Sequence, residues 1–194
     1  MKKLKIAFFE IEPWEKNYLK SQLNDFDLIF LEDKLNSQNL KKILDVDIFS
    51  PFIYSVVDKK IINSLESLKY IATRSTGFDH IDLKTCQKKN IPVSNVPTYG
   101  ENTVAEHTFA LILALSRKIC FSWGRTKLGD FSLENLRGFD LKGKVLGVVG
   151  TGNIGCHVIR IAKGFEMNVL AFDIKKDQKF AKKIGFKYVS LDNL

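Results

Sequence analysis

The 194-residue sequence has only three cysteines, few arginines and no long apolar run. Cys86, Cys120 and Cys156 are odd in number and lie in unrelated settings, which argues against a disulfide framework and favours a reducing cytoplasmic location. The longest apolar run, FALILALS, is far too short to cross a bilayer, and the basic start of the chain meets Glu10 too soon for a signal peptide. No two histidines have metal-ligand spacing. We therefore expect a soluble cytoplasmic protein without a metal site.

The formal net charge is +8, while the apolar and charged fractions, 45% and 27%, are those of an ordinary globular protein. Such a charge permits contact with nucleic acid or an anionic membrane. The lysines, however, are spread along the whole chain, and no Arg/Lys-rich tract is interleaved with aromatic residues. We interpret the charge as solvated surface and expect neither a nucleic-acid nor a membrane partner. Nucleic-acid binding remains an alternative hypothesis, which a steep salt dependence of DNA binding would support.

Short apolar runs alternate with helical patterns through the first hundred residues. Strands are expected at 4–10, 27–32, 47–54, 69–76 and 91–97, and helices at 12–23, 37–45, 58–68 and 83–90. An interruption of the third strand at Pro51 is left open. Ser37 is the expected cap of the second helix. Strands separated by short helices indicate a parallel sheet that is covered on both faces.

The pattern changes after Tyr99, where we place a domain boundary. Residues 101–125 predict one long helix, whose start is marked by the capping-box spacing of Thr103 and Glu106. Residues 126–144 are less apolar, contain three glycines and indicate a loop. A second α/β series follows, with strands at 145–150, 168–173 and 187–190, helices at 153–165 and 177–185, and the start of another helix at 190–194.

Gly150, Gly152 and Gly155 form a G-x-G-x-x-G motif between a predicted strand and a predicted helix. Gly150 would allow the tight turn, Gly152 would let the backbone approach a pyrophosphate, and Gly155 would let helix and strand pack closely. The helix start at Asn153 and Ile154 would direct unpaired N–H groups at the phosphates. The alternative is a glycine turn in an α/β fold that binds no nucleotide.

Asp173 ends the next predicted strand, 18 residues past Gly155. A carboxylate there would accept hydrogen bonds from the ribose hydroxyls and repel a 2′-phosphate, which favours NAD over NADP as cofactor. Lys175 and Lys176 follow closely and weaken that preference slightly. Taken alone, Asp173 could be only a helix cap.

Three segments carry a resemblance to a known family: ATRSTGFDHIDL, IPVSNVPTYGENTVAEHTFALILALSRK and LKGKVLGVVGTGNIG. Together they resemble the D-isomer-specific 2-hydroxyacid dehydrogenases, and most closely the D-lactate dehydrogenase branch, from about Lys69 to Asp173. The fold expected is α/β. The resemblance implies a flavodoxin-like parallel-sheet substrate domain, residues 1–99, followed by the first half of a Rossmann NAD-binding domain, residues 100–194.

The resemblance also implies site residues. The turn after the fourth strand, Ser75, Thr76 and Gly77, would offer backbone N–H groups to the carboxylate of a small 2-keto or 2-hydroxy acid. Tyr99 would lie near the substrate, and Thr103 near the cofactor phosphate. The alternatives are an ordinary strand-to-helix turn at 75–77 and a plain helix cap at Thr103.

Catalysis in this family uses an Arg, a Glu and a His that lie many tens of residues beyond the second dinucleotide strand, so the resemblance assigns no catalytic residue to this chain. Glu106 and His107 do not form an acid/base pair in their place, because adjacent residues on a helix point about 100° apart. We expect a fragment of an NAD-dependent D-2-hydroxyacid dehydrogenase, inactive alone, whose full-length form is a homodimer through the helix at 101–120 and the NAD domain. The alternative is a non-catalytic module that binds NAD or a partner subunit.

Overall fold

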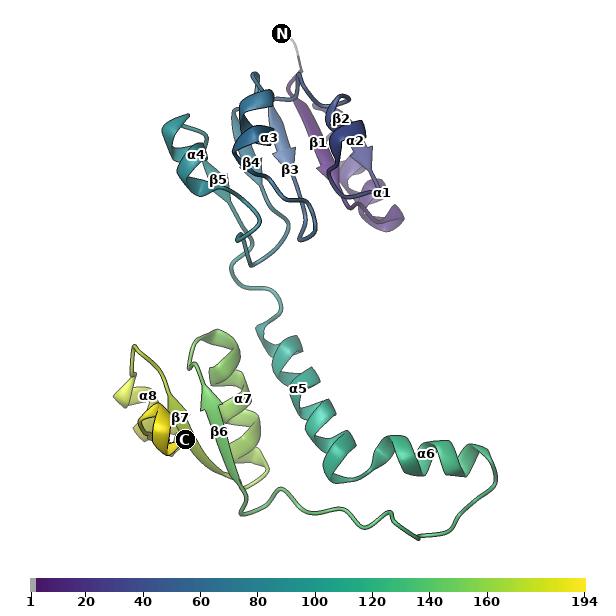
Figure 1. Cartoon of the computed structure of the whole chain (residues 1–194), viewed down its shortest axis with the longest axis vertical. Helices are drawn as coiled ribbons and strands as arrows, with labels where there is room; N and C mark the ends of the chain where they lie inside the picture. Colours follow the sequence, from purple (N-terminus) through teal and green to yellow (C-terminus); the bar gives the residue numbers. More distant parts are fainter. Residues whose placement is uncertain (1–2) are drawn as a thin grey trace. The chain divides into compact units, whose positions relative to one another are not determined.

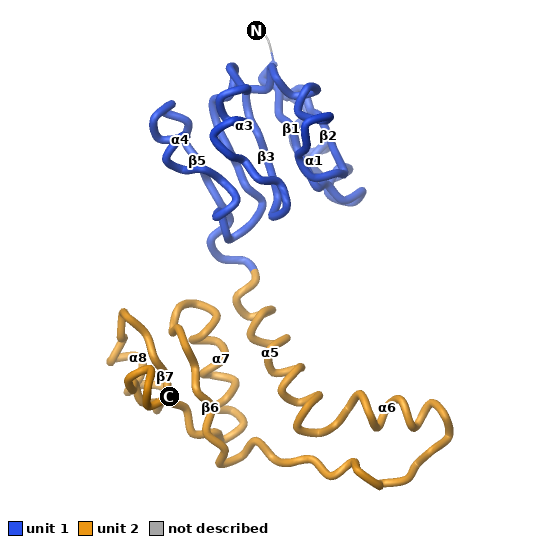
Figure 2. The backbone as a smooth tube through the Cα atoms, viewed as in Figure 1, with its two compact units in different colours: residues 1–99 blue, residues 100–194 orange. Residues whose placement is uncertain are grey.

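The computed structural model describes residues 3–194, which belong to two compact units, residues 1–99 and 100–194 (Figure 2). Each unit has its own parallel sheet with helices packed on it (Figure 1). This confirms the predicted α/β fold class.

The sheet of the first unit contains five strands, all paired in parallel. They are β1 Lys5–Phe9, β2 Asp27–Leu31, β3 Ile48–Ser50, β4 Tyr70–Ala72 and β5 Val93–Ser94. Their order, β2-β1-β3-β4-β5, is the flavodoxin-like order. The order reverses between β1 and β3, and ligands of such sheets bind outside the carboxyl ends of the strands near that point.

Both faces of this sheet are buried, as the alternation within β1 shows. Ile6 and Phe8 belong to one apolar cluster, whereas Ala7 and Phe9 belong to a second cluster on the other face. The covering helices are α1 Pro13–Gln22, α2 Ser37–Leu40, α3 Lys59–Ser64 and α4 Leu83–Lys88.

Two local predictions in this unit are corrected. The cap of α2 is Asn36, not Ser37, because the Asn36 side chain accepts hydrogen bonds from the N–H groups of Gln38 and Asn39. The third strand ends at Ser50 and does not continue to residue 54, since Pro51 has no N–H to donate to a ladder.

The second unit has a three-stranded parallel sheet in the order β6-β7-β8. Its elements are α5 Glu101–Ser116, α6 Ile119–Lys127, β6 Val145–Val149, α7 Asn153–Gly164, β7 Asn168–Phe172, α8 Gln178–Ile184, β8 Lys187–Tyr188 and the short 3₁₀ turn η1 Leu191–Asn193. Helices α5 and α7 lie side by side, with Phe109 stacked on Phe165 at 5.4 Å between ring centroids (Figure 1).

The single helix predicted over residues 101–125 is wrong. Helix α5 ends at Ser116, Lys118 has a left-handed φ of 53°, and α6 then begins. The Ser116 carbonyl accepts a hydrogen bond of 3.0 Å from the N–H of Phe139, a residue far along the chain. A continuous helix would need that carbonyl for its own ladder, so the crossing segment at residues 138–139 ends α5.

The predicted cap at Thr103 is also wrong. Helix α5 begins at Glu101 with Gly100 at the N-cap position, so Thr103 lies within the first turn. The Glu106 carboxylate accepts from the Asn102 side chain at 3.4 Å instead of closing a capping box. The capping-box spacing matched two residues that both lie inside the helix.

Gly138→Ala tests the crossing that ends α5. A Cβ at position 138 would lie 2.0 Å from the Ser116 carbonyl oxygen, so backbone has to move. We expect the free energy of unfolding of the second unit to fall by about 1–3 kcal/mol, measured by urea denaturation. The control is Gly124→Ala in α6, where no atom lies within 4 Å and helix propensity favours alanine. Equal stability of the two variants would contradict the account.

Candidate functional site

The glycine loop, residues 150–152, joins β6 to α7 at the carboxyl end of the sheet, and Gly155 lies in the first turn of α7. Gly150 has a φ of +94°, which favours glycine, and its N–H donates to the Phe172 carbonyl of β7 at 2.8 Å. Gly152 is the N-cap residue of α7. The first N–H groups of this helix, beginning with Asn153 and Ile154, have no intrahelical acceptor and suit an anion.

The fold requires two of the three glycines of the motif, each for a different reason. A Cβ at Gly155 would lie 2.0 Å from the Gly150 carbonyl oxygen, so close packing within the chain demands glycine there. Gly152 has no atom within 4 Å of a Cβ position, and its φ of −68° suits any residue. The fold therefore requires Gly150 and Gly155, whereas the open space at Gly152 is available to a ligand.

Asp173 lies directly after β7, and the structure brings it to the glycine loop. Its Oδ2 accepts from the N–H of Thr151 at 2.6 Å and from the Thr151 hydroxyl at 2.9 Å, while Oδ1 accepts from the N–H of Lys175 at 2.8 Å. These donors, the Thr151 N–H foremost, hold the pKa of Asp173 below its ordinary value. The site therefore carries a fixed negative charge beside the helix start.

The start of α5 lies near the same loop. The Asn153 amide donates to the Glu101 carboxylate at 3.3 Å, which joins the first residues of α5 and α7. Thr103 lies two residues after Glu101 in the first turn of α5, and it is exposed. Its hydroxyl is thus on the helix that borders the loop, although it does not cap that helix.

In the first unit, Ser75, Thr76 and Gly77 form the turn that follows β4. Their carbonyl oxygens are all engaged: Ser75 accepts from the N–H of Val96 at 3.0 Å, Thr76 from the Asn95 amide at 2.8 Å, and Gly77 from the Ser75 hydroxyl at 2.7 Å. Within residues 3–194, no chain group accepts a hydrogen bond from the three N–H groups of this turn. Hydrogen bonds to its carbonyl oxygens thus hold the turn, and its N–H groups remain available to an anion.

A small cluster of polar side chains packs against this turn. The buried Thr73 hydroxyl lies 2.7 Å from the Ser75 hydroxyl and 3.3 Å from Nε2 of His80. Burial is the main cause that lowers the pKa of His80 below its ordinary value, which favours the neutral ring. His80 therefore serves to hold the turn. Tyr99 ends the unit and is exposed.

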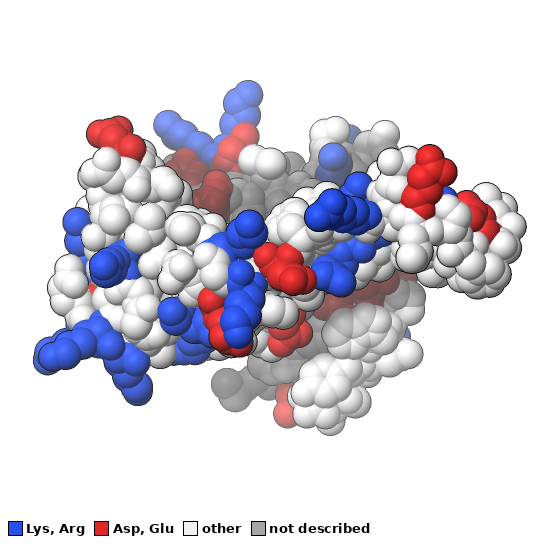
Figure 3. Space-filling view, turned by 90° about the horizontal axis from the view of Figure 1, so that it is seen from below, with Lys and Arg blue, Asp and Glu red and all other residues white. Residues whose placement is uncertain are grey.

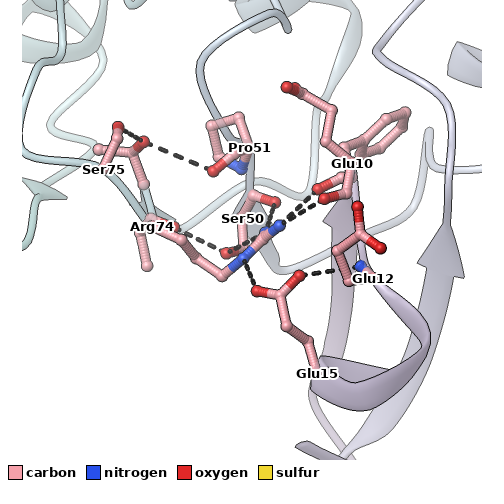
Figure 4. A network of polar contacts seen from close by, with 10 residues as sticks. Glu10, Glu12, Glu15, Ser50, Pro51, Arg74 and Ser75 are labelled. Atoms are coloured by element: carbon pink, nitrogen blue, oxygen red, sulfur yellow. Dashed lines mark hydrogen bonds and ion pairs between the residues drawn. The ribbon is translucent and has the colours of Figure 1, made fainter. Parts of the chain in front are cut away.

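Sequence reasoning missed Arg74, whose side chain joins the strand ends next to the turn (Figure 4). Nη2 donates to the carbonyls of Phe9 at 2.7 Å and Glu10 at 3.1 Å, and Nη1 donates to the Ser50 carbonyl at 3.0 Å. Nε forms an ion pair with Glu15 at 3.2 Å. The guanidinium thus links the carboxyl ends of β1, β3 and β4 to the first turn of α1. An arginine at the end of an apolar strand was the only sequence signal.

Beside Arg74 lies an open cavity of about 760 Å³ at the point where the strand order reverses. Trp14, Glu32, Phe52 and Tyr54 are among its lining residues, whereas the three residues of the 75–77 turn are not. The carboxylate of Glu10, a residue with a left-handed φ of 54°, accepts from the Tyr54 N–H at 2.8 Å and from the Ser55 hydroxyl. The cavity therefore lies beside the 75–77 turn and is not lined by it.

Two kinds of feature are absent from residues 3–194. No group of three or more His, Cys, Asp or Glu side chains is placed to hold a metal ion. No helix in that range is long and apolar enough to cross a membrane. On the face shown in Figure 3, Lys and Arg side chains are interspersed with Asp, Glu and uncharged residues.

Arg74→Met tests whether the guanidinium holds the strand ends together. The side chain is only 18% exposed, and its loss leaves the Glu15 carboxylate and several backbone carbonyls without their donor. We expect the free energy of unfolding of the first unit to fall by about 2–4 kcal/mol, measured by urea denaturation. Lys60→Met, at an exposed position of the same unit, should change it by less than about 0.5 kcal/mol. A similar small effect of both substitutions would show that the network does not stabilise the unit.

The chain is similar to known proteins along nearly its whole length. A 2-hydroxyacid dehydrogenase homolog of Haemophilus influenzae is 37% identical over 98% of the chain, and the D-lactate dehydrogenase of Escherichia coli is 35% identical over 98%. The structure of D-lactate dehydrogenase from Aquifex aeolicus, complexed with NAD and lactic acid, superposes with a TM-score of 0.90 at 33% identity over 97% of the chain.

The chain spans 59% of the length of the two curated relatives and 56% of the Aquifex chain. Residues 6–184 match the family described as D-isomer specific 2-hydroxyacid dehydrogenase, catalytic domain. The matched segment includes the 75–77 turn, the glycine loop and Asp173. The chain therefore belongs to the D-isomer-specific 2-hydroxyacid dehydrogenase family.

Proposed function

We propose that this chain supplies the substrate-carboxylate turn and the adenosine side of the cofactor site of an NAD-dependent D-2-hydroxyacid dehydrogenase. The reaction would interconvert a 2-keto acid and a D-2-hydroxy acid, with lactate as the first substrate to test. The observation that carries the proposal is the open space at Gly152, because neither backbone conformation nor packing within the chain calls for glycine there. A pyrophosphate that approaches the backbone would call for it.

NAD fits the residues present better than NADP. Asp173 is charged, oriented by Thr151 and Lys175, and placed at the end of β7, where a ribose hydroxyl would donate to it. The same charge would repel a 2′-phosphate. When bound, NAD supplies the hydride chemistry of the reaction. The residues of α7 and the loop bind and orient it, and Thr103 would lie near its phosphates.

In the first unit, the N–H groups of Ser75, Thr76 and Gly77 would bind the substrate carboxylate and fix its orientation. Tyr99 would lie near the same substrate. Substrate domain and NAD-binding domain would then correspond to residues 1–99 and 100–194. The group that moves the proton to or from the substrate oxygen is not assigned to any residue of this chain.

A second candidate is a non-catalytic module that binds NAD or a partner subunit. It is favoured by β6, which stands at one end of its sheet and carries Val145 and Val149 at 62% and 68% exposure. Exposed apolar strand edges favour association with another chain. The exposed apolar residues of α5, Leu111 and Leu115, likewise support a homodimer of the full-length form through this helix. A cytoplasmic location completes the proposal, since free thiols are typical of reducing compartments.

Substitutions in the loop test the cofactor site. Gly152→Val fills the open space and should raise the Kd for NAD about tenfold or more, and Asp173→Ala should raise it about ten- to hundredfold through loss of a charge-assisted hydrogen bond. Isothermal titration calorimetry measures both. Gly164→Ala, at an open position at the far end of α7, is the control and should leave the Kd unchanged. Unchanged affinity in both loop variants would remove the cofactor proposal.

A turnover assay tests whether the proton-transferring group lies outside this chain. With NADH and pyruvate, the chain alone should bind NADH, seen as a change in its fluorescence, without oxidising it, seen as constant absorbance at the NADH band. Turnover by the chain alone would contradict the proposal that the proton-transferring group lies elsewhere. Coding sequence directly after the Leu194 codon that encodes an Arg, a Glu and a His in the family's catalytic pattern would favour the dehydrogenase over the binding module.

A further inference from the structure

A directed series of hydrogen bonds runs from the start of α8 to Asp173. The N–H of Asp177 donates to the Tyr188 hydroxyl at 3.2 Å, the Tyr188 hydroxyl lies 2.8 Å from Oγ1 of Thr151, and that hydroxyl donates to Oδ2 of Asp173 at 2.9 Å. An ionised carboxylate only accepts, so the Thr151 proton must point at Asp173. Thr151 Oγ1 must then accept from Tyr188, whose own oxygen accepts from Asp177.

The Tyr188 hydroxyl is held in place by its surroundings. The Tyr188 backbone pairs with Ala171 in the β7–β8 ladder, and the next residue, Val189, donates its N–H to the Ala171 carbonyl at 2.9 Å. The Tyr188 ring packs edge-on against Phe186 at 5.1 Å between centroids. Because both backbone and ring are fixed, the hydroxyl has a defined position beside Thr151.

This series determines which oxygen of Asp173 is open to a ligand. Oδ2 accepts two hydrogen bonds from Thr151, which fill the lone-pair positions of that oxygen. Oδ1 accepts the N–H of Lys175. Oδ2 is therefore held against the glycine loop, whereas Oδ1, with a single hydrogen bond, keeps a lone pair for a ligand.

We propose that Tyr188 is a positioning residue for cofactor selectivity, which acts through Thr151 to hold Oδ2 of Asp173 against the loop and to present Oδ1 to the ribose hydroxyls. The proposal rests on the NAD site proposed above. It adds a residue outside the glycine motif and the acidic strand end, and it assigns the Thr151 side chain the role of a link between Tyr188 and the carboxylate.

Tyr188→Phe keeps the ring and removes only the hydroxyl. We expect the Kd for NAD to rise about three- to tenfold, as the loss of one hydrogen bond in the series implies, and the ratio of the NADP Kd to the NAD Kd to fall. The ratio falls because a less firmly held carboxylate binds the ribose of NAD less well and can move away from the 2′-phosphate of NADP. A residue that matters only for folding would weaken both cofactors equally. Isothermal titration calorimetry on the full chain measures the two constants.

A double-mutant cycle with Thr151→Val tests whether Tyr188 acts through Thr151. In the Thr151→Val background, Tyr188→Phe should have no further effect on either constant, and thermal melts should show that each variant is folded. Tyr70→Phe in the first unit is the matched control and should leave both constants unchanged. An unchanged selectivity ratio in Tyr188→Phe, or an equal effect of Tyr188→Phe in both backgrounds, would overturn the proposal. If the unsubstituted chain bound neither cofactor, the NAD site itself would be wrong, which is a distinguishable result.

Discussion

Parallel strands that end at one edge of a sheet leave backbone groups there without ladder partners, and this chain meets that constraint differently in its two units. In the first unit, Arg74 donates to the carbonyls at the ends of β1 and β3, while the 75–77 turn keeps its acceptors engaged and its donors open. In the second unit, the glycine loop turns sharply into α7 and leaves the first N–H groups of that helix open. Both edges thus present donors that suit anionic ligands.

The two groups of strand ends differ in the charges beside them, and therefore in the ligand that each would suit. The 75–77 turn packs on a polar cluster of Thr73, Ser75 and the half-buried His80, none of them a carboxylate, so its N–H groups would suit a small carboxylate. The glycine loop instead has Asp173 beside it, with its charge held by Thr151. The loop suits a ligand with a negative group for the helix start and a hydroxyl donor for the carboxylate, and the pyrophosphate and ribose of the proposed NAD would supply these two groups.

Much of this arrangement could be predicted from the sequence because it depends on short-range patterns. The alternation of apolar runs and helical segments predicted the parallel sheets, and the spacing from Gly150 to Asp173 predicted that the loop and the acid would meet. Contacts between distant segments could not be predicted. The end of α5 depends on Phe139, and the role of Arg74 depends on carbonyls in two other strands. Thr103 failed as a cap because residues inside a helix can share the spacing of a capping box.

An NMR titration of the 194-residue chain with NAD tests the central claim most directly, because each open N–H group gives its own signal. The account predicts that the amide signals of Gly152, Asn153 and Ile154 shift on addition of NAD, together with those of Asp173 and its neighbours. Amides at the far end of α7, such as that of Gly164, should stay in place. Shifts confined to residues outside the loop, or no shifts at a concentration at which NAD binding is seen calorimetrically, would contradict it.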